Sequence, residues 1–100
     1  MAKTTKTSGA RTIKIAPDLR IAGARAAYVA LRDAAGGPES RVALDGRQVE
    51  KIDAAGIQAI VAGRKVLGAA GKKMTWVGTS AQLKAAAGLL GLAEALGLPE

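Results

Sequence analysis

Two aspartates lie at positions where their carboxylates could act in catalysis or in binding. Asp45 ends the apolar segment 41–45, and Asp53 directly precedes three small residues, 54–56. The sequence contains no His and no Cys, so its serines lack the usual imidazole base and the common zinc ligands are missing. A pair of carboxylates alone is a weak signal for an enzyme. These residues therefore predict a protein without catalytic activity, metal or other cofactor.

Motifs for phosphate chemistry are also missing. The segment 68–74, GAAGKKM, has the wrong spacing for a P-loop and leads into a predicted strand instead of a helix. A phosphoacceptor receiver would need several acids near its first strand to hold Mg²⁺, and this region offers only Asp18. Nucleotide-binding and receiver functions are therefore disfavoured.

Composition and charge limit which other functional classes fit the sequence. One hundred residues with 49% apolar content predict a single globular domain, and the net charge of +7 raises nucleic acid as a partner. The basic residues are scattered, with pairs only at 64–65 and 72–73, and no aromatic side chains lie among them for base stacking. Nucleic-acid binding is thus the weaker alternative. No apolar run approaches the roughly 18 residues of a membrane span, and the start lacks a secretory h-region, which predicts a cytoplasmic protein.

Hydrophobic periodicity predicts alternating strands and helices. Residues 1–11 are polar and basic, which is typical of a flexible tail before a domain at 12–98. The order β-β-α-β-α-β-α-(α) follows from strands at 12–16, 19–21, 41–45 and 72–79, and from helices at 22–35, 54–70, 81–90 and 92–98. An α/β domain with helices covering at least one face of a sheet is therefore expected.

Local signals assign roles to several residues. Asp53 is predicted to cap the helix that follows, accepting from the N–H of Ala55 or Gly56, and Ser80 is a second N-cap. The aromatic residues Tyr28 and Trp76 are predicted to fill the core or its edge. Inward positions at helical spacing are expected to form the core: Ala24, Ala27, Leu31, Ile57, Ile60, Val61, Leu67, Leu83, Ala86, Ala87 and Leu90.

The segment 42–60, VALDGRQVEKIDAAGIQAI, resembles the central motif of STAS domains, the family of anti-sigma-factor antagonists and of the cytoplasmic domains of sulfate transporters. In that family a strand ends in Asp, as at Asp45, and an Asp-Ser/Thr-x-Gly-Leu box opens the next helix, as at Asp53, Gly56 and Ile57. The closing segment 78–96 is also similar. The resemblance covers residues 12–98 and implies an STAS-like fold, a small mixed β-sheet covered by helices.

One position departs from this pattern. The family's phosphorylatable Ser or Thr falls on Ala54, which carries no hydroxyl group. The resemblance therefore implies a non-catalytic interaction module of bacterial signalling without a phosphorylation switch, binding an anti-sigma-factor or kinase-like partner or a chemotaxis-associated complex. Its partner-binding residues would be Asp53, Ala54, Ala55, Gly56 and Ile57. The alternative within the family is an accessory subunit that binds the ATPase of a lipid-transport ABC system.

Overall fold

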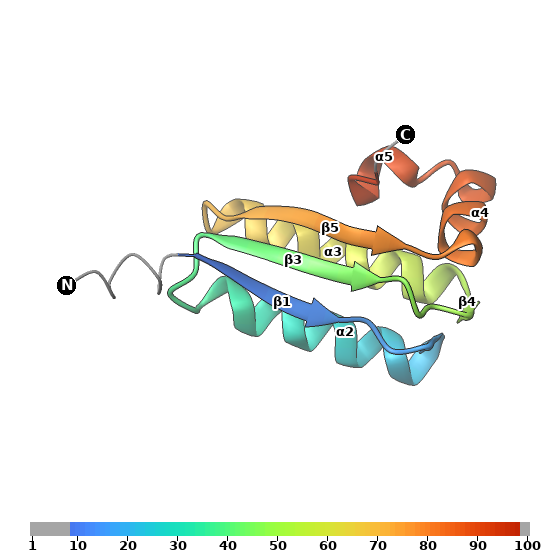
Figure 1. Cartoon of the computed structure of the whole chain (residues 1–100), viewed down its shortest axis with the longest axis horizontal. Coiled ribbons are helices and arrows are strands. Elements are labelled where there is room, and N and C mark those ends of the chain that lie inside the picture. The colour runs from blue at the N-terminus through green and yellow to red at the C-terminus, as the bar shows by residue number, and fades with distance from the viewer. Residues whose placement is uncertain (1–8, 99–100) are drawn as a thin grey trace.

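The computed structural model describes residues 9–98, which form alternating strands and helices (Figure 1). The strands are β1 (Ala10–Lys14), β2 (Asp18–Leu19), β3 (Arg41–Gly46), β4 (Lys51–Ile52) and β5 (Lys73–Thr79). The helices are α2 (Ile21–Ala35), α3 (Ala54–Ala69), α4 (Ala81–Leu90) and α5 (Ala93–Leu96). The predicted α/β class and the order of the longer elements are confirmed.

Several segment boundaries and one short element differ from the sequence prediction. Strand β1 begins at Ala10, so the last two residues of the expected tail belong to the sheet, while residues 1–8 of that tail lie outside the described residues. The second strand ends at Leu19, and α2 already begins at Ile21. The short strand β4 was not predicted, because a strand of two residues carries no periodicity.

The main sheet has the strand order β1-β3-β5, and β2 pairs with β4 in a separate small ladder. Every pair between described strands is parallel, so the expectation of a mixed sheet is wrong over residues 9–98. The physical reason is that a helix carries the chain back to the end of the sheet where the strands begin, between consecutive main strands. All three main strands therefore have their carboxyl ends at the same end of the sheet.

Helices α2 and α3 cover one face of the main sheet, whereas no described helix covers its other face (Figure 1). The register places Ile13, Leu44 and Trp76 side by side beneath these helices. Trp76 is half-buried and donates its indole N–H to the Leu96 carbonyl at 2.9 Å. Predicted inward residues fill the core: Ala24, Ala27, Leu31, Ile57, Ile60, Val61, Leu67, Leu83 and Ala87 are buried, Tyr28 and Ala86 are half-buried, and only Leu90 is exposed.

Strand β2 is enclosed by the first turns of the two long helices. A Cβ atom added to Gly56 in α3 would lie 2.0 Å from the Leu19 carbonyl oxygen and 2.9 Å from Leu19 Cγ. A Cβ atom added to Gly23 in α2 would lie 2.0 Å from the carbonyl oxygen of Asp18. Only glycine allows both helices to approach this backbone so closely. The two helix starts are therefore fixed against the same short strand.

The variant Gly56→Ala should lower the free energy of unfolding by about 1–3 kcal/mol, the usual cost of overpacking a tight contact. This cost should exceed the gain of about 1 kcal/mol that alanine brings to a helix interior. Gly68→Ala is the matched control in the same helix, since a Cβ atom there meets nothing within 4 Å. The control should be neutral or stabilised by up to about 1 kcal/mol. Urea unfolding of both variants measures the difference, and a stable Gly56→Ala variant would contradict the contact.

Candidate functional site

The predicted cap at the start of α3 is confirmed. Asp53 has an extended backbone with φ of −133°, and its carboxylate accepts a hydrogen bond from the Gly56 N–H at 3.0 Å. The N–H groups in the first turn of a helix have no partner inside the helix, and the helix dipole makes this end positive. The Asp53 carboxylate satisfies one of these donors and places its negative charge at the favourable end.

The five residues of the predicted partner site separate into an exposed part and a buried part. Ala54 and Ala55 are exposed and Asp53 is half-buried, whereas Gly56 is buried and Ile57 is fully buried. Burying an isoleucine side chain contributes about 1.5–3 kcal/mol, so Ile57 holds the first turn of α3 on the core. Gly56 and Ile57 therefore pack inside the domain, and the surface here consists of residues 53–55.

A concave region of about 530 Å³ lies beside this surface. Its lining combines residues of β2, the start of α2 and the cap of α3: Asp18, Arg20, Ile21, Ala22, Gly23 and Asp53. Ile21 is 78% exposed although it is a large apolar residue. Sequence reasoning missed Arg20 and Ile21, because Ile21 fitted the end of the second strand. The one sequence feature that could have indicated an exposed Ile21 is its position just outside the inward-facing stripe of the predicted helix.

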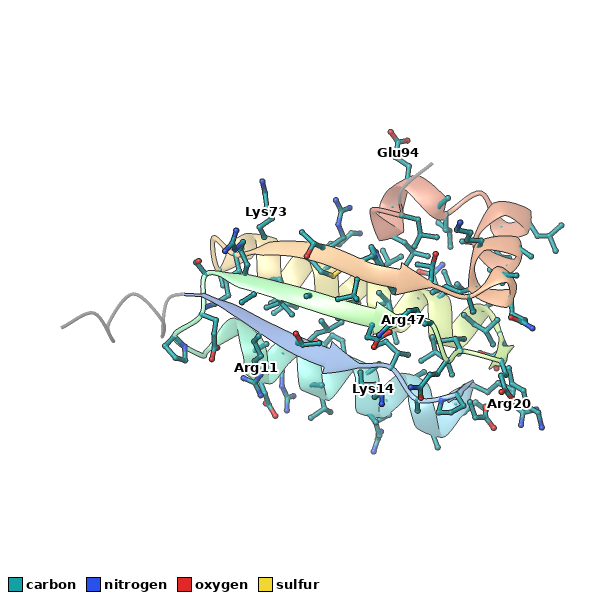
Figure 2. All side chains as sticks on the ribbon, in the orientation of Figure 1. Arg11, Lys14, Arg20, Arg47, Lys73 and Glu94 are labelled. Atoms are coloured by element: carbon teal, nitrogen blue, oxygen red, sulfur yellow. The ribbon has the colours of Figure 1, made fainter. Side chains whose placement is uncertain are left out.

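Asp18 and Arg20 form an ion pair in the lining of the concave region. Two side-chain hydrogen bonds of 2.8 Å join the Arg20 guanidinium to the Asp18 carboxylate. These bonds from Arg20 hold the pKa of Asp18 below its ordinary value. Both side chains are about half exposed, at 52% and 53%, and such pairs contribute little to stability. The pair therefore supplies an oriented polar patch in the same lining as Ile21, and Figure 2 shows Arg20 at this end of the molecule.

Asp45 has a partner of its own and does not join Asp53. It is 7% exposed and accepts hydrogen bonds from the Arg47 guanidinium at 3.0 and 2.9 Å and from the Arg47 backbone N–H at 3.2 Å. These bonds from Arg47 lower the pKa of Asp45 to about 2. The strand-end acid thus closes the loop after β3, and the two predicted acids do not form a carboxylate pair with a shared role.

Within residues 9–98, no three His, Cys, Asp or Glu side chains come together in a group that could hold a metal ion. None of the described helices is both long and apolar enough to cross a membrane. The exposed features around the starts of α2 and α3 are the apolar Ile21, the Asp18–Arg20 ion pair and the Asp53 cap.

Comparison with known protein families agrees with this architecture. A family model described as "Mlab, STAS domain" matches residues 2–99. The chain belongs to the STAS domain family. No curated protein matches the chain. STAS domains are generally non-catalytic modules of protein–protein interaction, with anti-sigma-factor antagonism as an association at the level of the family.

In this STAS domain, Asp53→Ala should lower the free energy of unfolding by about 0.5–2 kcal/mol through loss of the cap. Asp53→Ser is the control, because a serine hydroxyl can accept the same hydrogen bond from the Gly56 N–H. The serine variant should retain most of the stability. Thermal unfolding of the three proteins compares them, and equal losses in both variants would show that capping is not the role of Asp53.

Arg47→Met should raise the pKa of Asp45 above about 2, because the guanidinium that favours its ionised form is removed. In the wild type, the paired carboxylate stabilises the fold above its unfolded pKa of about 3.9, and this stabilisation is lost as the pH falls through about 2. In the variant the loss should begin at higher pH. An NMR titration of the Asp45 carboxyl carbon and an acid unfolding curve measure both effects.

Arg20→Met is the control for this experiment. It breaks the exposed ion pair with Asp18 and removes one positive charge, as Arg47→Met does. Acid unfolding should change little in the control, since the Asp18 carboxylate stays hydrated. An unchanged pKa of Asp45 in Arg47→Met would contradict the assignment.

Proposed function

We propose that this STAS domain binds a partner protein through one surface, which we call the docking surface and which consists of Asp18, Arg20, Ile21, Asp53, Ala54 and Ala55. The carrying observation is the convergence of two helix starts, with the exposed Ile21 on one and the short side chains of Ala54 and Ala55 on the other. Membership of a family of interaction modules supports this role. The rigid contact of both helices with β2 holds the surface in a fixed shape.

The chemistry of the docking surface suits a protein partner. Ile21 offers an apolar anchor, and the Asp18–Arg20 pair and Asp53 provide a polar rim. Interfaces typically combine a small apolar centre with a polar surround. Because Ala54 and Ala55 have short side chains, a partner's side chain can approach the first turn of α3 closely. A small-molecule substrate would instead need a more enclosed and largely apolar cavity.

Binding at this surface would not be switched by phosphorylation of the box. Ala54 occupies the position of the family's phosphoacceptor, and residues 49–60 contain no Ser, Thr or Tyr. A phosphate at the start of α3 would otherwise add strong negative charge to the surface. The proposed module therefore remains competent to bind, and regulation would depend on the amount or state of the partner.

Two classes of partner fit this proposal, and both place the protein in the cytoplasm. The first is a kinase-like anti-sigma factor or a chemotaxis-associated complex, as in STAS domains of bacterial signalling. The second is the ATPase of a lipid-transport ABC system, another setting in which stand-alone STAS proteins occur. Calorimetry with purified proteins of each class, chosen from genes beside this one, distinguishes them.

Ala54→Glu should abolish binding to the partner while leaving the fold intact. Glutamate is a good helix former, and a negative charge at the first helical position is compatible with the helix dipole. At the interface, however, the larger side chain and its unpaired charge would oppose association. Calorimetry with the partner measures binding, and thermal unfolding checks the fold.

Ala62→Glu is the matched control. Ala62 is exposed on the same helix and lies about 12 Å further along its axis. The control introduces the same side chain and charge, so it should bind as the wild type does. If Ala54→Glu bound the partner with unchanged affinity, the docking surface would lie elsewhere.

A further inference from the structure

A second concave region lies at the opposite end of α3, along the outer edge of β5. It has a volume of about 750 Å³ and lies between the second half of α3, the start of β5 and α5. We call it the edge groove. Its lining contains the basic residues Arg64, Lys65, Lys72 and Lys73, the apolar Val61 and Met74, and no acidic residue.

The backbone of β5 is open along this groove. Strand β5 is an edge strand that pairs with β3 on one side only. The Lys73 N–H donates to the Ser40 carbonyl at 3.1 Å, on the β3 side. Because the backbone groups of successive residues in a parallel strand point to opposite sides, those of Met74 point outward into the groove. They have no hydrogen-bond partner among the described residues.

Helix α5 is tied to β5 further along the strand. There Trp76 donates its indole N–H to the Leu96 carbonyl, which holds α5 against the strand. Arg64 supports this arrangement from α3, since its guanidinium donates to the Ala95 carbonyl at 3.0 Å. Helix α5 thus closes one end of the groove and leaves the outward groups of Met74 accessible.

The basic residues of the groove have different roles. Arg64 is bonded to Ala95, and the Lys72 ammonium donates to the carbonyls of Gly37 and Glu39 at 2.6 and 2.5 Å. The side chains of Lys65 and Lys73 are exposed, and their ammonium groups form no ion pair or hydrogen bond with any described residue. Figure 2 shows Lys73 extending from the sheet edge, away from β3. The groove therefore contains two unengaged ammonium groups, one on α3 and one on β5.

We propose that the edge groove binds an acidic, extended peptide segment of a partner protein as an additional strand beside β5. The peptide backbone would bond to the outward N–H and C=O of Met74, as in other cases of strand addition. Its acidic side chains would pair with Lys65 and Lys73, and its apolar side chains would pack on Val61 and Met74. This site is separate from the docking surface and does not depend on it.

Two observations favour a peptide over a small anion. The groove presents unpaired backbone groups, which a phosphate cannot satisfy in the manner of a strand. The two other cations, Arg64 and Lys72, are already bonded to backbone carbonyls of the domain. The unengaged charges therefore lie on two different elements along an extended surface, as recognition of an extended acidic chain requires.

The test uses the full chain and a fluorescent peptide of about six residues, the usual length of a strand, in which glutamate alternates with valine. Fluorescence anisotropy should show saturable binding that weakens with salt. In NMR spectra of the labelled protein, exchange of the Met74 amide should slow on binding. Peptides with every second amide N-methylated, prepared in both registers, should include one that fails to bind, since that register removes the donors facing β5.

The double variant Lys65→Glu/Lys73→Glu should weaken peptide binding by about tenfold or more, because two attractive contacts become repulsive. The control Arg25→Glu/Lys84→Glu makes the same change in net charge at exposed positions outside the groove, on α2 and α4, and should bind nearly as well as the wild type. Ala54→Glu should also leave peptide binding unchanged, which separates this proposal from the docking surface.

Three results would overturn the proposal. The first is equal loss of binding in both double variants, which would indicate attraction by net charge alone. The second is retained binding of both N-methylated peptides. The third is binding of inorganic phosphate, but not of the peptide, in the groove. In that last case Lys73 would serve only to protect an edge strand from unwanted pairing, as lysines on edges often do.

Discussion

The contact between Leu19 and the first turn of α3 is the constraint on which the rest of the structure depends. Gly56 allows the helix to rest directly on the Leu19 carbonyl, and Gly23 gives α2 the same relation to Asp18. Both long helices are thereby anchored at one end to β2. Since these helices cover the same face of the sheet, their anchoring also fixes how the core between helices and sheet is filled.

This constraint explains why residues that pack in the core lie directly beside residues of the proposed docking surface. In the first turn of α3, Gly56 and Ile57 face inward and are needed for the contact with Leu19 and the core. Ala54 and Ala55 are exposed, and the approach of α2 brings Ile21 beside the preceding Asp53. The proposed docking surface is therefore a consequence of how the two helices are held together. It requires no flexible loop.

The two proposed interaction sites use different physical properties of the fold. At the carboxyl end of the sheet, the docking surface combines an apolar anchor with a polar rim on rigid helix starts. At the other end of α3, the edge groove offers backbone groups and unengaged positive charge. The parallel arrangement separates them, because α3 runs from one end of the sheet to the other. A partner can thus occupy one site without covering the other.

The sequence by itself determined the features that depend on neighbouring residues. The caps at Asp53 and Ser80 join a side chain to an N–H three residues later, and the inward faces of α2 and α3 follow from helical spacing. Only the tertiary structure decided that the described strands run parallel, that Gly56 is buried while Ala54 is exposed, and that Ile21 lies beside Asp53. These facts arise from contacts between segments far apart in the chain, which local periodicity does not record.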